Sequence, residues 1–171
     1  MARRADPGSP APVRTHRYAA RIEWTGNDGT GTRDYRSYRR DHVIQSPGKP
    51  ELAGSADPVF RGDAGRYNPE ELLVASLSAC HMLWYLHLCA SGGVVVTDYR
   101  DDAEGSMDES PDGSGRFSLV TLHPRVRISA GNPSRALELH EAAHRHCFIA
   151  NSVNFPVRCE PTVEVEGQTK V

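Results

Sequence analysis

NPEELLVASLSACHMLWYLHLCASGG (residues 68–93) is the segment with the clearest structural signal in this chain. Asn68 can cap a helix, Pro69 suits the first helical position, and Glu71 completes a capping box. Two glycines follow the apolar pattern, so the sequence predicts a helix from Pro69 to about Ala90. Apolar residues lie on nearly every side of this helix, which predicts that it is buried. Serines and histidines interrupt the apolar run, which argues against a membrane span.

The sequence around this helix predicts an α+β fold. Alternating apolar residues and turn-forming residues indicate strands before and after the helix, and Asn132-Pro133 repeats the cap-then-proline opening of a second helix. The expected order is β-β-loop-α-β-β-α-β, with mostly antiparallel sheets packed around the central helix. The expected elements are strands over 16–24 and 32–44, a long loop over 46–67, strands over 94–107 and 116–129, a second helix over 133–146 and a last strand from 156 to 165.

Composition narrows the class of protein. The 171 residues include 20 basic and 22 acidic side chains, so the basic excess typical of a nucleic-acid partner is missing. Residues 1–15 lack the apolar core of a secretion signal and are expected to be a flexible tail, with a single domain over 16–171. We therefore expect a cytoplasmic protein with no membrane partner, whose four cysteines stay reduced.

Two of these cysteines have a distinctive spacing. Cys80 lies ten residues after Glu70 of the Asn-Pro-Glu motif, and Cys147 follows 67 residues later. This pattern, from about Tyr18 to Val165, resembles the OsmC/Ohr family of thiol-dependent peroxidases. The resemblance implies the OsmC-like fold, an intertwined homodimer, and reduction of organic hydroperoxides, with hydrogen peroxide as a further candidate substrate.

The resemblance also implies roles for these cysteines. Cys80 would attack the hydroperoxide, and Cys147 would resolve the resulting sulfenic acid as a disulfide. An external dithiol, of the lipoyl type in Ohr-like proteins, would then reduce that disulfide. No metal, flavin or haem is implied. Cys89 lies nine residues after Cys80, on the opposite face of the helix, so it cannot resolve Cys80. Cys159 shows no supporting pattern, and both Cys89 and Cys159 are expected to be structural.

A cation is expected beside Cys80, because a free cysteine thiol is mostly protonated at neutral pH and only the thiolate is nucleophilic. The resemblance supplies an arginine for this role, held by Glu70. Arg61 matches an OsmC-like position best, and Arg33 and Arg39 are where an Ohr-like arrangement would place it.

The helix geometry bears on the subunit arrangement. Ten residues at 1.5 Å each separate Glu70 from Cys80 by about 15 Å, too far for one guanidinium to touch both. The Glu70 that serves a given Cys80 is therefore expected to come from a second subunit. The hydroperoxide is expected to enter an apolar pocket beside Cys80, lined by Leu77, Leu83, Trp84 and Phe148.

A competing motif is present in the second helix. His140-Glu141-Ala142-Ala143-His144 matches HExxH, in which two histidines one turn apart bind zinc and the glutamate acts as base. An HExxH-type zinc hydrolase is therefore one alternative function. A catalytically inert OsmC-like binding domain is the other.

Overall fold

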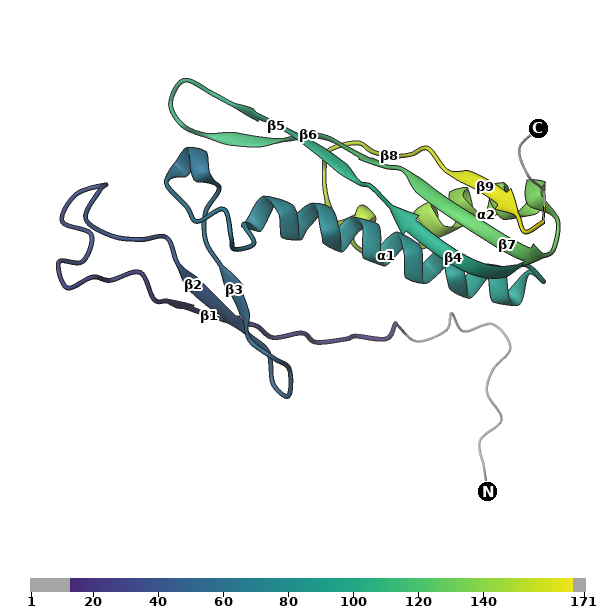
Figure 1. Ribbon diagram of the computed structural model, residues 1–171, viewed down its shortest axis with the longest axis horizontal. Helices are drawn as coiled ribbons and strands as arrows, with labels where there is room; N and C mark the ends of the chain where they lie inside the picture. The colour runs from purple at the N-terminus through teal and green to yellow at the C-terminus, as the bar shows by residue number, and fades with distance from the viewer. Residues whose placement is uncertain (1–12, 168–171) are drawn as a thin grey trace. The chain divides into compact units, whose positions relative to one another are not determined.

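The computed structural model describes residues 13–167 of the chain (Figure 1). The chain divides into two compact units, one ending at Arg66 and the other beginning at Tyr67, and each is described by itself. The prediction of a single domain over 16–171 is not tested by this division and stays a prediction. Of the predicted flexible tail, residues 1–12 lie outside the described residues.

The first unit contains a three-stranded antiparallel sheet in the order β1-β2-β3. The prediction of a strand over 32–44 is wrong for residues 32–41, where the side chains of Asp34 and Ser37 accept backbone N–H groups and so compete with a strand ladder. The predicted long loop over 46–67 in fact contains β3 and a short helix. The elements are β1 (Arg21–Trp24), β2 (His42–Gln45), β3 (Leu52–Gly54) and the 3-10 helix η1 (Pro58–Phe60).

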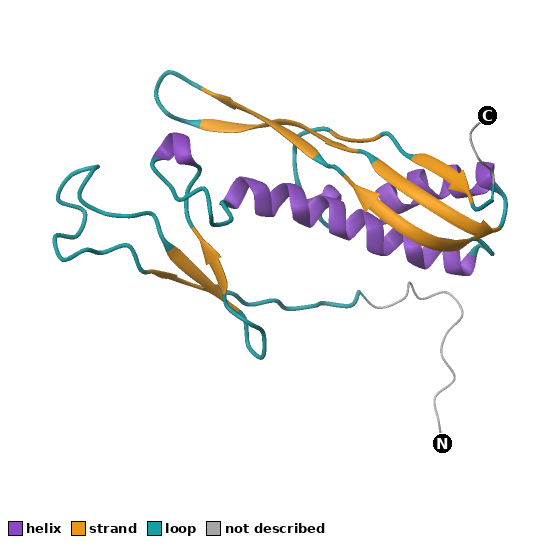
Figure 2. Cartoon of the chain, viewed as in Figure 1, coloured by secondary structure: helices purple, strands orange, loops and turns teal. Residues whose placement is uncertain are grey.

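The second unit has two helices and two three-stranded sheets, drawn in purple and orange in Figure 2. One sheet has the order β4-β7-β9 and the other β5-β6-β8. Its elements are α1 (Pro69–Ser91), β4 (Val95–Asp101), β5 (Glu104–Glu109), β6 (Gly115–Leu122), β7 (Pro124–Ala130), α2 (Pro133–His146), the 3-10 helix η2 (Ala150–Ser152), β8 (Val157–Cys159) and β9 (Thr162–Val165).

Each of the last three predicted strands is two shorter strands in the structure. Proline has no backbone N–H to donate, and Pro124 begins β7 while Pro161 separates β8 from β9. The edge strands β8 and β9 pair in parallel with β6 and β7, whereas the four other pairings among the described strands are antiparallel. The predicted α+β class with mostly antiparallel sheets is confirmed.

Both helices begin where the sequence predicts. The Asn68 side chain accepts a hydrogen bond from the Glu71 N–H at 2.7 Å, and the Glu71 carboxylate accepts one from the Asn68 N–H at 3.2 Å. Asn132 caps α2 with its side chain, which accepts the Ser134 N–H at 2.8 Å. After α1, Gly93 adopts a left-handed φ of 72°, which glycine tolerates at no steric cost.

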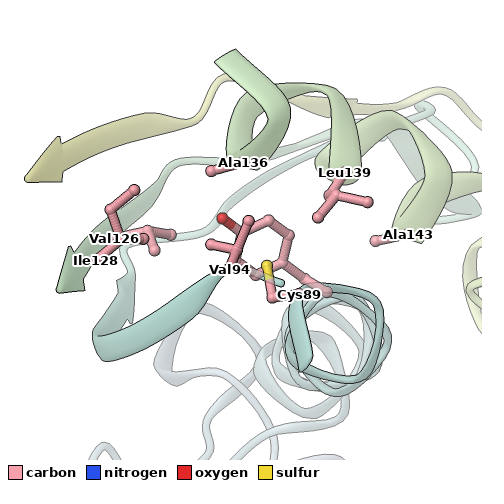
Figure 3. Close-up of a cluster of buried hydrophobic side chains, with 8 residues drawn as sticks. Cys89, Val94, Val126, Ile128, Ala136, Leu139 and Ala143 are labelled. Atoms are coloured by element: carbon pink, nitrogen blue, oxygen red, sulfur yellow. The ribbon is translucent and has the colours of Figure 1, made fainter. Parts of the chain in front are cut away.

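The core lies between the helices and the strands. One cluster joins α1, α2 and β7 (Figure 3), and a smaller one packs Leu77 against Val120 and Leu122. Four residues of α1, spaced four apart, are buried in this chain: Leu77, His81, Tyr85 and Cys89. On another side of the helix Leu83 is 64% exposed. By length and composition alone α1 could cross a membrane: the mean hydropathy is 1.5 over an 18-residue window, of which 22% is buried within the chain, and a single such helix is weak evidence for a membrane span.

Candidate active site

The structure brings Cys80 and Cys147 together from the two helices. Cys80 lies in the middle of α1 and is half-buried, and Cys147 is the residue that ends α2 and is buried. The Cys80 thiol is near enough to act on the pKa of Cys147, and the Cys147 sulfur also accepts the Ala150 N–H at 3.4 Å. All four cysteines of the chain are free thiols.

The surroundings of Cys147 separate the two thiols chemically. Burial, and secondarily the hydrogen bond with Cys80, raises the pKa of Cys147 to about 11. Cys147 is therefore protonated at neutral pH and is a poor first nucleophile. Cys80 is the more accessible of the pair, which makes it the better candidate to meet a substrate.

Cys80 lies on the wall of an open apolar pocket of about 630 Å³. The ring of Trp84 meets that of Phe148 edge-to-face at 5.6 Å between centroids, which gives the pocket an aromatic wall. Its lining residues are Ser76, Ala79, Cys80, Leu83, Trp84, His87 and Phe148.

Of the four residues predicted to line this pocket, Leu83, Trp84 and Phe148 do so and Leu77 does not. Leu77 is fully buried and packs against Val120 and Leu122. Leu77 lies four residues before His81, about 40° away around the helix, and belongs to the buried stripe of α1.

The residues predicted to activate Cys80 lie in the first turn of α1 and in the first unit. Glu70 lies in the first turn of α1, about 15 Å of helix rise from Cys80. The candidate arginines Arg61, Arg33 and Arg39 belong to the first unit. Arg61 follows η1 with a left-handed φ of 67° and is exposed, with no ion-pair partner among residues 13–167. Arg39 by contrast contacts both Asp28 and Asp41.

The HExxH helix is not arranged as the motif suggests. His140 is buried at 2% exposure, whereas Glu141 is exposed and His144 is half-buried. Among residues 13–167, the group of side chains that could share a metal ion pairs His140 with His81 and Cys159, and His144 is outside it. His140 is instead a core residue, whose ring stacks on that of Tyr85 at 3.8 Å between centroids.

The sequence reasoning missed the grouping of His81, His140 and Cys159. The i, i+4 spacing of Leu77, His81 and Tyr85 was the available signal for the buried side of α1. No local pattern in the sequence could predict that this side of α1 lies against α2 and β8. Cys89, in contrast, is buried in the large core cluster, as expected for a structural cysteine (Figure 3).

Comparison with known proteins identifies relatives of this chain. Residues 62–162 match the profile of the OsmC-like protein family. An OsmC-like protein of unknown function from Vibrio cholerae is 30% identical, with a TM-score of 0.79 over 86% of this chain and 100% of its own. Among curated proteins, none matches.

Two more distant structures share the fold. An organic hydroperoxide resistance protein from Legionella pneumophila is 19% identical, with a TM-score of 0.62 over 90% of this chain and 100% of its own. One from Elizabethkingia anophelis is 17% identical, with the same TM-score over 90% and 99%. The family match and the Vibrio relative together show that this chain belongs to the OsmC-like protein family.

Proposed function

We propose that this protein is a thiol-dependent peroxidase that reduces organic hydroperoxides to alcohols. The observation that carries the proposal is the contact between the Cys80 and Cys147 thiols, with Cys80 on the wall of an apolar pocket. Membership of the OsmC-like family supports it, because some proteins of this fold are named for organic hydroperoxide resistance. An apolar pocket also suits the organic part of such a substrate better than it suits hydrogen peroxide.

In the first step the Cys80 thiolate attacks the distal oxygen of the hydroperoxide. The O–O bond breaks as the S–O bond forms, so sulfur loses two electrons and the substrate gains them. The departing alkoxide takes up a proton and leaves as the alcohol. Cys80 is left as a sulfenic acid.

In the second step the sulfur of Cys147 attacks the Cys80 sulfenic acid. The S–O bond breaks, one water molecule leaves and a disulfide forms. An external dithiol, of which lipoyl groups are the class we favour, then reduces this disulfide by thiol–disulfide exchange. The interaction between the Cys80 and Cys147 thiols of one chain favours resolution within that chain.

Activation of Cys80 needs a cation, and Arg61 is the residue we favour. Arg39 contacts Asp28 and Asp41, which satisfy its charge, whereas Arg61 has no such partner among the described residues. Glu70 would hold the arginine from a second subunit, because one helix separates it from its own Cys80 by about 15 Å. The working unit is then a homodimer with two composite sites, and we expect it to be cytoplasmic.

A peroxide assay tests this proposal. Stoichiometric tert-butyl hydroperoxide should be consumed without added reductant, and thiol titration should show two of the four thiols lost per chain. The Cys80→Ser variant should consume none. A wild-type protein that consumes no peroxide would favour the inert binding domain. A hydrolase activity lost in Glu141→Gln would favour the HExxH alternative.

A further inference from the structure

A second cluster of reactive side chains lies on the buried side of α1, apart from the cysteine pair. His81 Nε2 and His140 Nδ1 are 3.0 Å apart. The Cys159 sulfur lies 3.5 Å from His81 Nε2 and 4.0 Å from His140 Nδ1. Both histidines are buried, with exposures of 1% and 2%, and Cys159 is half-buried. None of these three residues has a part in the peroxidase chemistry proposed above.

The three atoms have the spacing of ligands around one ion. A triangle with these sides has its centre about 2.1 Å from each corner, and zinc bonds to histidine nitrogen and cysteine sulfur are about 2.0–2.1 and 2.3 Å. An ion slightly out of the plane of the three atoms can satisfy all three bonds. Two nitrogens and a sulfur are also the donors that zinc and copper prefer.

A hydrogen bond between the two histidine rings leaves one nitrogen of each ring without a partner among the described residues. If one ring donates to the other, the remaining nitrogens are His81 Nδ1 and His140 Nε2, and neither has a partner among residues 13–167. A metal ion held by the facing nitrogens, His81 Nε2 and His140 Nδ1, would leave these other two as N–H groups, so it accounts for the close approach of the facing pair and not for the unpaired atoms.

Negative charge near the cluster favours a cation. The Asp101 carboxylate is held by the Ser78 hydroxyl at 2.5 Å and by the His123 N–H at 2.7 Å. The negative charges of Asp101 and Glu160 both act on the Cys159 thiol. The same two carboxylates would attract a positive ion in place of the thiol proton.

We propose that His81, His140 and Cys159 form a binding site for one transition-metal ion of the zinc or copper type. The three ligands come from α1, α2 and β8, so the ion would tie the short edge strand β8 to both helices. A tetrahedral ion would keep one further position for water or a small ligand. The bound ion would stabilise the fold, since the ligands are brought together only by folding.

Metal binding by the full chain tests this site. Purified protein, stripped with a chelator and reloaded with Zn²⁺ or Cu⁺ alone, should bind one ion per chain by elemental analysis and competition titration. The bound ion should raise the midpoint of thermal unfolding. Cys159→Ser should weaken binding by more than about 100-fold, because losing even an outer-shell partner costs 10–100-fold. A wild-type protein that binds neither ion would overturn the proposal and leave only a histidine–histidine hydrogen bond.

Two controls distinguish this metal site from the HExxH motif and from binding by the other cysteines. His144→Ala should keep the ion, whereas the HExxH motif would make His144 a ligand. The triple variant Cys80→Ser/Cys89→Ala/Cys147→Ser leaves Cys159 as the sole cysteine, and its Co²⁺ complex should show a sulfur-to-cobalt charge-transfer band. This readout needs no substitution within the proposed site. Absence of the band, or loss of the ion in His144→Ala with retention in Cys159→Ser, would contradict the assignment.

Discussion

Cys80 and His81 are neighbours in α1 but lie in opposite surroundings. Cys80 is half-buried on the wall of an open apolar pocket, beside a second thiol. His81 is 1% exposed and faces a histidine and a cysteine from two other elements. One helical step of about 100° separates an accessible redox pair from a buried ligand cluster. The two sides of α1 can therefore carry different chemistry, and each can be altered without touching the other's residues.

The largest effect is expected on the pocket side. Cys80→Ser should reduce hydroperoxide turnover by more than about 10³-fold, because removing a nucleophile abolishes the covalent step. Peroxide consumption by the purified variant is the measurement. Cys89→Ala is the matched control, since Cys89 is buried in the core on the other side of the same helix. Full turnover in Cys80→Ser would place the chemistry elsewhere.

Cys147→Ser should stop the reaction after one turnover. The Cys80 sulfenic acid then has no resolving thiol, so mass spectrometry should find one added oxygen on Cys80 and no disulfide. The wild-type protein, treated identically, should instead lose two thiols per chain. Sustained turnover by Cys147→Ser with a lipoyl-type dithiol would show that Cys147 is dispensable for resolution.

Subunit mixing tests whether the site on the pocket side of α1 needs a residue from a second chain. Glu70→Ala and Cys80→Ser proteins should each be inactive, and their mixture should recover about one quarter of the wild-type activity after random exchange, because each hybrid dimer has one intact site. Exchange is verified by mass spectrometry of tagged chains. No recovery after verified exchange, or full turnover by a monomer, would contradict the composite site.

The smallest effects compare two leucines of α1. Leu77→Ala should lower the free energy of unfolding by about 2–5 kcal/mol, because Leu77 is fully buried. Leu83→Ala, at an exposed pocket position, should lower it less but raise KM for bulky hydroperoxides. Denaturant unfolding and steady-state kinetics measure the two effects. Equal losses of stability in the two variants, with an unchanged KM in Leu83→Ala, would contradict the distinction between the buried side and the pocket side of α1.

Local sequence signals predicted the helices well. Asn68 with Pro69, and Asn132 with Pro133, form caps that depend only on adjacent residues, so both helix starts were predicted correctly. The strands were harder to predict, because pairing and strand breaks depend on distant partners. Residues 32–41 alternate too weakly to show that side chains such as Asp34 would bond their own backbone instead of a neighbouring strand.

The candidate site was likewise predicted in part from the sequence and in part only by the tertiary structure. The motif around Glu70 and the spacing of Cys80 and Cys147 were sufficient to single out a cysteine pair, because the family resemblance rests on those positions. Only the tertiary structure placed His81 against residues 59 and 78 positions away along the chain. Such contacts arise when helices and a parallel edge strand pack in a core, and that packing leaves no periodic trace in the sequence.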